Sequence, residues 1–280
     1  MARKSTKKRK ELVAAMQTPP HIAFVIITTA LHTQHTDRLR KQLQKAKIPN
    51  CTVYVVENKI GVDGYAKGVN RGMKEALQAG VEIIFLANPD IDIASLLTQP
   101  FLEAADHFDV WGYAMHQDET TYFGGEIDAW RLSGGLIAQP STSRFAPCHF
   151  VSGSLMAVNA AAAKRIGWFD ERYGMYYEDV DYCQRASDLH FRVGIDSDLT
   201  YTHFEQSARH TSQDVGYEKK ALLQASHLRF FLQYASVHNV IYEILRYPIT
   251  FFSEPIYALL LREFVMSLIK KTVHKYANRT

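Results

Sequence analysis

Three continuous apolar runs in the first third of the chain set the strongest limit on its fold. They occupy residues 22–28, 52–56 and 83–87, and amphipathic helical patterns over 36–46 and 65–79 separate them. A strand without alternating polar residues is typically buried on both faces, as in parallel sheets. This part of the chain therefore predicts a β-α-β-α-β unit with right-handed crossovers, the pattern of a nucleotide-binding half-sheet.

The third apolar run ends abruptly in the polar sequence Asn88-Pro89-Asp90-Ile91-Asp92. Open α/β sheets bind their ligands at the carboxyl ends of their strands. Asp90 and Asp92 are two residues apart, so on an extended chain they point to the same side. Two carboxylates suit Mg²⁺ or Mn²⁺, and such an ion suits a diphosphate. The alternative is that Pro89 and the aspartates only make a turn into the next helix.

Further strands and helices are expected around this unit. In chain order, the pattern predicts a weak helix over 95–107, a strand over 110–115, hairpins and loops over 118–147, a strand over 150–158, a helix over 160–166, a helix from about 178, and strands over 191–195 and 199–202. From residue 226 onward the pattern is helical and aromatic.

Composition indicates a globular chain in a reducing compartment. The 280 residues are 47% hydrophobic and 22% charged, which is enough to bury a substantial core. The three cysteines, Cys51, Cys148 and Cys183, are far apart and odd in number, so they predict no disulfide framework. No spacing of cysteine and histidine is typical of a zinc site.

Basic residues gather at the two ends of the chain. Residues 1–10 carry six Lys or Arg and residues 270–280 carry four, which leaves 22 basic against 29 acidic residues between them. Basic ends are solvated tails by default, and otherwise contact nucleic acid or anionic lipid. The acidic body makes a nucleic-acid role the least favoured. The sequence contains no uncharged apolar stretch of 18 residues, so no transmembrane helix is predicted. It also has no signal-peptide pattern, so no secretory signal peptide is predicted.

The last helical pattern, residues 255–271, is amphipathic and ends in basic residues. Pro255 suits the first turn of this helix, and Ser253 suits its cap. The apolar face is expected to pack on the domain or on a second copy of the chain, as in a homodimer formed through the C-terminal helices. Contact with an anionic membrane surface is the alternative.

Short motifs stand in a characteristic order along the chain. They are Glu57-Asn58, the segment from Gly64 to Gly72, Asn88-Pro89-Asp90, Gly153, Trp168-Phe169-Asp170-Glu171, Glu178-Asp179-Val180-Asp181 and His203. This order resembles that of the inverting family 2 glycosyltransferases with the GT-A fold, most closely their rhamnosyltransferase-like branch. The resemblance covers about residues 21–210.

The resemblance implies a fold class and a division into parts. The fold would be α/β, a Rossmann-like GT-A mixed and mainly parallel sheet flanked by helices, with a C-terminal helical extension. The predicted parts are a basic arm over 1–20, a catalytic domain over 21–225 with a nucleotide-sugar half (21–117) and an acceptor half (118–225), and an amphipathic helical region over 226–280.

The resemblance also assigns residues to the donor. The nucleotide-sugar side would comprise Thr28, Glu57, Asn58, Asp63, Gly64, Lys67, Asn70, Asn88 and Asp90. Glu57 stands where the family has an aspartate that binds uracil or thymine, which favours a UDP or dTDP sugar over a GDP sugar. Asp90, Asp92 and His203 would hold a divalent cation, Mg²⁺ or Mn²⁺.

Catalysis is assigned to the second acidic stretch. Asp179 falls on the family's general base, with Glu178 beside it, and Gly153, Trp168 and Asp170 fall on the acceptor side. The alternative is that these acids only favour the dipole at a helix start. The predicted function is inverting transfer of a hexose to a saccharide or lipid-linked acceptor for surface polysaccharide or glycolipid. It would take place in the cytoplasm or peripherally on the cytoplasmic face of a membrane.

Two other functions compete with this prediction. The first is a catalytically inactive nucleotide-sugar-binding or scaffold protein with the same fold. The second is a nucleotidyltransferase, which would be expected to carry a glycine-rich basic motif after the first strand. The segment 28–35 has no such motif.

Overall fold

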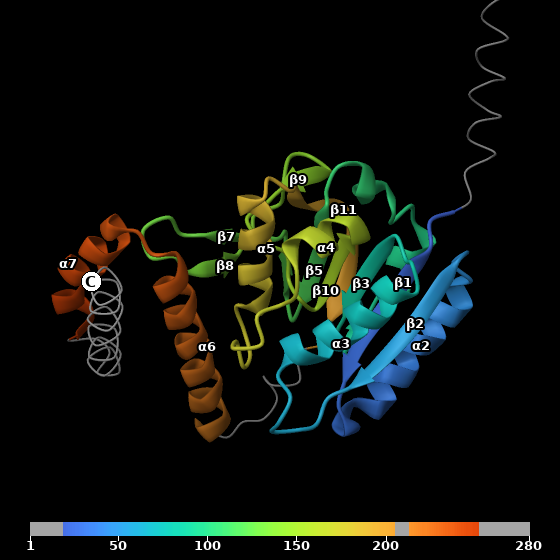
Figure 1. The fold of residues 1–280 in the computed structure, drawn as a ribbon, viewed down its shortest axis with the longest axis horizontal. Coiled ribbons are helices and arrows are strands. Elements are labelled where there is room, and N and C mark those ends of the chain that lie inside the picture. The colour runs from blue at the N-terminus through green and yellow to red at the C-terminus, as the bar shows by residue number, and fades with distance from the viewer. Residues whose placement is uncertain (1–18, 205–212, 252–280) are drawn as a thin grey trace, which may run out of the picture.

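The computed structural model describes residues 19–204 and 213–251, and these centre on one large sheet (Figure 1). Its strand order is β2-β1-β3-β10-β5-β11-β4, with β6 paired to β5 and β9 paired to β11. Most of the predicted basic arm and the whole helix predicted over 255–271 lie outside the described residues. Within the described part, no helix is long and apolar enough to cross a bilayer.

The predicted β-α-β-α-β unit is confirmed. It consists of β1 (Ile22–Thr28), α2 (Thr33–Ala46), β2 (Cys51–Glu57), α3 (Tyr65–Gln78) and β3 (Ile83–Ala87). Both β2 and β3 pair parallel to β1, which is buried along its whole length. A central strand covered on both faces explains why its sequence does not alternate.

The second half of the chain adds antiparallel and parallel strands to the same sheet. The strand β10 (Leu155–Asn159) inserts antiparallel between β3 and β5 (Val110–Gln117). The long strand β11 (Val193–His203) then runs parallel to β5, and the short β4 (Ile91–Asp92) pairs with its end. The predicted class, a mixed and mainly parallel α/β sheet flanked by helices, is confirmed.

Several predicted boundaries were wrong for local reasons. The strand predicted over 150–158 begins only at residue 155, because hydroxyls of Ser152 and Ser154 bond each other and the backbone here. The two strands predicted over 191–202 are one strand, β11, whose pairing with β5 shifts register between residues 196 and 200.

The weak helix predicted over 95–107 is two short 3-10 segments instead, η2 (Leu96–Thr98) and η3 (Glu103–Asp106). Pro100 lies between them and has no N–H to donate to a helix. The predicted hairpins and loops contain four short strands: β6 (Thr120–Tyr122), β7 (Gly125–Ile127), β8 (Gly134–Leu136) and β9 (Phe145–Pro147).

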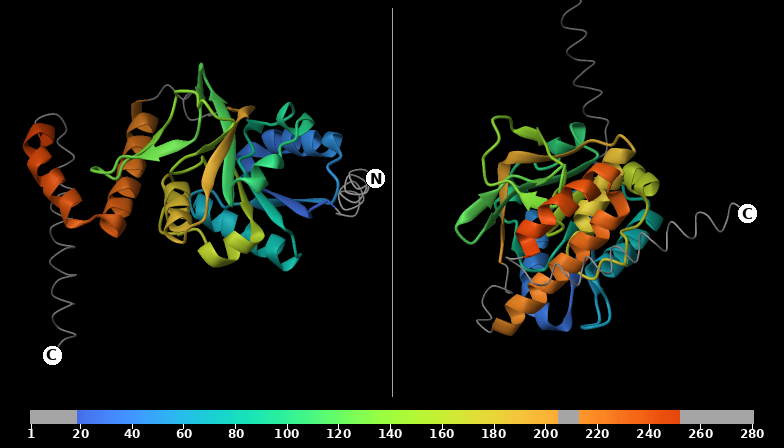
Figure 2. Two further views of the ribbon diagram at one scale, coloured as in Figure 1. Left: turned by 90° about the horizontal axis from the view of Figure 1, so that it is seen from above. Right: turned by 90° about the vertical axis from the view of Figure 1, so that its left-hand side faces the viewer.

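Helices cover both faces of the sheet. One hydrophobic core joins the sheet to α3, α4 (Ala160–Ile166) and α5 (Glu178–Asp188), and the other joins it to α2, η2 and η3. Two further helices, α6 (Gln213–Tyr234) and α7 (Val237–Phe251), follow. The views agree that α6 lies beside α5 and that α7 projects beyond it (Figures 1 and 2). The predicted boundary between residues 225 and 226 falls inside α6.

Candidate active site

The candidate site lies where several strands end at the same edge of the sheet. In the parallel register of β1 and β2, Thr28 stands beside Glu57. In the register of β1 and β3, Ile26 stands beside Ala87, directly before the Asn-Pro-Asp segment. At the same edge, His203 at the end of β11 pairs with Ile91 of β4. The topology therefore brings residues 28, 57, 88–92 and 203 together, as the sequence predicts for a ligand-binding edge.

Asp90 and His203 form a close pair. His203 Nε2 lies 3.5 Å from Asp90 Oδ1, and His203 Nδ1 lies 3.1 Å from Gln117 Oε1. The backbone N–H of Phe204 donates to the Asp90 carbonyl at 2.8 Å. Burial raises the pKa of Asp90, but the contact with His203, together with a backbone hydrogen bond and His32, leaves the pKa below its ordinary value.

This pair fits a divalent cation. Asp90 Oδ1 is buried and has no hydrogen-bond partner in the described part of the chain, although a buried carboxylate oxygen ordinarily has one. Two ligand atoms that each lie about 2.1 Å from one ion are roughly 3–3.5 Å apart, which agrees with the separation of Asp90 Oδ1 and His203 Nε2. A carboxylate and an imidazole are ordinary ligands for Mn²⁺ and similar ions.

Asp92 makes a different contact. Its Oδ1 accepts a hydrogen bond at 3.0 Å from the N–H of Ala94, two residues on, and its backbone pairs with Thr202. Among the described residues, no three histidine, cysteine or acidic side chains gather in a way that could hold a metal. Asp90 and His203 are the two predicted ligands that lie together, and the Oδ1 of Asp92 caps its own turn through the N–H of Ala94.

Asp179 is held at the start of α5 by backbone donors. Its Oδ2 accepts the N–H of Gly153 at 2.8 Å, and its Oδ1 accepts the N–H of Val180 at 2.9 Å. Burial raises the pKa of Asp179, and these two N–H donors oppose the shift. Tyr65 from α3 donates its hydroxyl to the Gly153 carbonyl, so the same peptide segment links donor-side α3 to the acid.

Glu178 is buried next to Asp179. Its Oε2 has no hydrogen-bond partner within the described residues. Burial, followed by the neighbouring charge of Asp179, raises the pKa of Glu178 to about 8. Glu178 is therefore the member of the pair that holds a proton more readily near neutral pH.

The half-buried Tyr65 and the buried Tyr201 lie near both the acidic pair and Asp90. The pKa values of Tyr65 and Tyr201 are raised, first by burial and then by acidic neighbours that include both Asp179 and Asp90. The Tyr201 hydroxyl lies 2.7 Å from Ser154 Oγ, on the segment that carries Gly153. Asp90 and Asp179 thus both raise the pKa of the same two tyrosine hydroxyls, which contact the segment 153–154.

Several predicted donor residues hold the local backbone. Asn58 is buried, donates to the Gly64 carbonyl at 3.0 Å, and accepts from Arg71 at 2.6 Å. Asp63 pairs with Lys67 at 2.7 Å, and this hydrogen bond is the main cause of its lowered pKa. These contacts fix the loop between β2 and α3, and Gly64 starts α3 as its cap residue.

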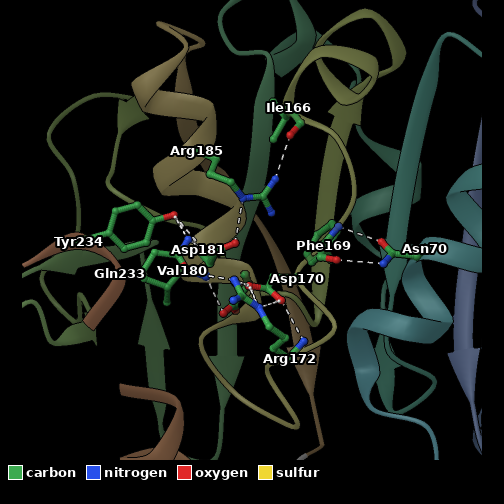
Figure 3. A network of polar contacts seen from close by, with 11 residues as sticks. Asn70, Ile166, Phe169, Asp170, Arg172, Val180, Asp181, Arg185, Gln233 and Tyr234 are labelled. Atoms are coloured by element: carbon green, nitrogen blue, oxygen red, sulfur yellow. Dashed lines mark hydrogen bonds and ion pairs between the residues drawn. The ribbon is translucent and has the colours of Figure 1, made fainter. Parts of the chain in front are cut away.

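The other residues predicted to bind the donor lie at strand ends or on α3. Thr28 Oγ1 is 2.7 Å from Thr36 Oγ1 inside the protein, and Glu57 is exposed at the end of β2. The N–H of Asn88 donates to the Ser154 carbonyl at 2.9 Å. Asn70 on α3 bonds both the N–H and the carbonyl of Phe169 (Figure 3).

Of the predicted acceptor residues, one is exposed and two make contacts within the protein. Trp168 is 49% exposed and free to contact a ligand. Asp170 makes a close ion pair with Arg172, 2.6 Å between Asp170 Oδ2 and Arg172 Nη2, and this contact is the main cause of its lowered pKa (Figure 3). Gly153 lies directly between Tyr65 and Asp179, where an added Cβ would stand 3.4 Å from each.

Sequence reasoning missed His32 and both tyrosines. His32 lies just beyond β1 with its Nδ1 2.9 Å from Thr29 Oγ1, and its charge contributes to the lowered pKa of Asp90. Its position directly after a strand that ends at the site was the available signal. Tyr65 opens α3 and Tyr201 lies within β11, where an aromatic residue is ordinary core material, so neither carried a signal.

Comparison with known proteins points to glycosyltransferases. No family model matches the chain. The low-salt glycan biosynthesis hexosyltransferase Agl10 of Haloferax volcanii is 26% identical over 149 residues, which is 48% of this chain and 46% of that protein. The chain thus spans about half the length of this curated relative.

The structure of GalNAc-T7 with UDP, GalNAc and Mn²⁺ matches with a TM-score of 0.51 and 10% identity, covering 81% of this chain and 50% of that one. The catalytic domain of Drosophila β1,4-galactosyltransferase 7 gives 0.43 and 13% identity over 68% of this chain and 74% of that one, too weak for an argument. The fold is therefore the GT-A glycosyltransferase fold. In sequence, the chain is similar to a hexosyltransferase.

Proposed function

We propose that the chain is a glycosyltransferase that moves a hexose from a nucleoside-diphosphate sugar to an acceptor hydroxyl. The observation that carries this proposal is a pair of centres at one edge of a GT-A fold. One centre is Asp90 with His203, which fits a cation, and the other is Asp179 with Glu178, which fits a general base. The segment 153–154 contacts both centres, because the N–H of Asn88 donates to the Ser154 carbonyl and the N–H of Gly153 donates to Asp179, so one small substrate can span them.

Asp90 and His203 would hold the divalent cation of this enzyme, Mg²⁺ or Mn²⁺. Such an ion supplies, when bound, a Lewis acid that stabilises negative charge on a leaving nucleoside diphosphate. Gln117 fixes the orientation of the His203 ring through Nδ1, which leaves Nε2 directed at Asp90. The lowered pKa of Asp90 keeps its carboxylate ionised at neutral pH, as a metal ligand must be.

Asp179 acts as the general base in this proposal. It accepts the proton of the acceptor hydroxyl as that oxygen attacks the anomeric carbon. The N–H groups of Gly153 and Val180 fix the orientation of its carboxylate, and the raised pKa of Glu178, about 8, favours a neutral neighbour beside it. One base and one displacement invert the configuration at the anomeric carbon, by the logic of inverting glycosidases.

The donor in this proposal is a UDP or dTDP sugar. Glu57 supports it, because its carboxylate is exposed at the end of β2 beside Thr28 and can accept the N3–H of uracil or thymine. The acceptor is a saccharide or a lipid-linked saccharide that enters beside the exposed Trp168, since aromatic side chains offer sugars a flat apolar surface. Synthesis of a surface polysaccharide or glycolipid is the role that fits such an acceptor.

The test is a thermal-shift screen of UDP, dTDP and GDP sugars with and without Mn²⁺, followed by a transfer assay with the donor that binds. A ligand that binds only the folded state raises the melting temperature. Asp90→Asn should abolish the Mn²⁺-dependent part of the shift, whereas the matched variant Asp92→Asn should retain it. Equal donor affinity in EDTA and in Mn²⁺ would contradict the cation site, and no transfer with any donor would contradict the function.

We further propose that the chain attaches to the cytoplasmic face of a membrane through its C-terminal region. On α7, Val237, Ile241, Ile244 and Leu245 are all at least half exposed and share one side of the helix. The basic residues over 270–280 complement an anionic surface. All three cysteines lie in the described part and are free, which suits the cytoplasm. The protein should float with anionic liposomes at low salt, and a stable dimer that does not float would contradict this.

A further inference from the structure

We propose that α6 is a positioning element of the active site, which holds a strained turn so that Asp179 keeps its catalytic orientation. This inference rests on the proposed function for its kinetic part. It departs from the sequence-based division of the chain, which divides this helix between the acceptor half and a separate C-terminal region. The residues that carry it are Ser226, His227, Phe230, Gln233 and Tyr234 of α6.

The turn before α5 has an uncommon backbone. Tyr176 and Tyr177 are consecutive and both have positive φ, 71° and 68°. Bulky side chains rarely adopt this left-handed region, because their Cβ atoms crowd the neighbouring carbonyl oxygens. Glu178 and Asp179 follow at once, so the direction in which they leave the turn depends on this conformation. Such a backbone persists only where its surroundings determine it, and it is found most often at functional sites.

The helix α6 contacts the turn on both sides of the strained residues. Before it, Ser226 Oγ donates to the Met175 carbonyl at 2.8 Å. On it, the buried ring of Tyr177 stacks on His227 and lies against Phe230, each with ring centroids 5.5 Å apart. The helix therefore contacts the backbone of Met175, which enters the turn, and the side chain of Tyr177 within it.

A third contact lies just after the acidic pair. Asp181 is fully buried in the first turn of α5, and its Oδ1 accepts from Tyr234 at 2.7 Å and from Gln233 at 3.0 Å (Figure 3). Its Oδ2 accepts from Arg185 Nε at 2.9 Å. A buried carboxylate with three donors is costly to move, because each lost donor leaves it less compensated. Residues 175–181 are thus fixed to α6 at three places that bracket Asp179.

The remaining contacts of Asp179 cannot set its position alone. They come from the N–H of Gly153 and from its own neighbour Val180, and the second moves with the turn. Without the contacts to α6, Tyr176 and Tyr177 could leave the left-handed region, and the Asp179 carboxylate would lose its alignment with the acceptor. Donor binding should not depend on this turn, since His203 lies on β11 and Asp90 lies in the segment between β3 and β4, and both are held by the sheet and by each other.

The experiment removes two hydroxyls of α6 without changing the packing. Ser226→Ala with Tyr234→Phe deletes the bonds to Met175 and Asp181. The matched control is Tyr242→Phe on α7, whose hydroxyl makes no hydrogen bond to residues 19–204 or 213–251. Hydrogen exchange measured by mass spectrometry reports on residues 174–182, and kinetics report kcat and the donor KM.

The double variant should exchange amides of 174–182 at least tenfold faster, with the central strands unchanged. Its kcat should fall at least tenfold, while the donor KM stays within twofold and the control behaves as the wild type. Unchanged exchange over 174–182, uniformly faster exchange across the sheet, or an unaltered kcat would each overturn the inference. If the wild type transfers no sugar, the proposed function fails, and the exchange measurement still decides whether α6 holds the turn.

Discussion

Replacing Glu178 by Gln should change how the stability of this protein depends on pH. Burial raises the pKa of Glu178 from an ordinary 4.5 to about 8, so between these values the folded state binds a proton that the unfolded state has lost. Stability must then fall as pH rises through this window, because ionisation is easier in the unfolded chain. The difference of roughly 3.5 pH units corresponds to as much as about 5 kcal/mol at 1.36 kcal/mol per unit.

Glutamine is neutral at every pH and nearly the same size, so Glu178→Gln resembles the protonated wild type. Its free energy of unfolding should match that of the wild type near pH 4 and exceed it by several kcal/mol near pH 8. Urea unfolding followed by circular dichroism at half-unit steps of pH measures both curves. Glu75→Gln, at an exposed position on α3, removes the same charge without burial and should run parallel to the wild type. A constant difference between wild type and Glu178→Gln from pH 4 to 8 would refute the reasoning.

Two further changes test the base and the packing. Asp179→Asn keeps the size of the side chain but cannot take a proton, so kcat should fall by roughly 10² to 10⁴ while donor affinity measured by calorimetry stays the same. Gly72→Ala places a Cβ 2.1 Å from Val25 Cγ1, so α3 must move off β1, and urea unfolding should show a loss of about 1–3 kcal/mol.

The first half of the fold could be predicted because its signals are local. The residues of β1 and β3 are buried throughout and, apart from Thr28 at the end of β1, apolar, so the sequence itself indicates a strand covered on both faces. The strand β10 lies antiparallel between β3 and β5, and nothing local encodes that insertion. The two short 3-10 segments were likewise missed, because their apolar residues have the spacing of an ordinary helix.

The candidate site was predictable where a motif falls at the end of an element. Asp90 and His203 end up together because β3 and β11 both end at that edge, although 113 positions separate them in the chain. The contacts of Asn70 were not predictable, since its partner Phe169 lies 99 residues away and bonds through its backbone. Nor could any motif indicate that Tyr176 and Tyr177 are left-handed, because neither residue type favours that region.

The two centres of the site differ in how they are supported. His203 ends β11, and the Asp90 carbonyl accepts the N–H of the next residue, Phe204. Both are thus tied to the central sheet, whose backbone hydrogen bonds and two hydrophobic cores resist displacement. Asp179 leaves a turn of rare conformation that side chains of another helix hold in place. Elements with strained backbones and few ladder bonds open at lower free energy than the sheet around them. Substitutions spread over the molecule should therefore lower turnover sooner than donor binding, and those on α6 should separate the two most clearly.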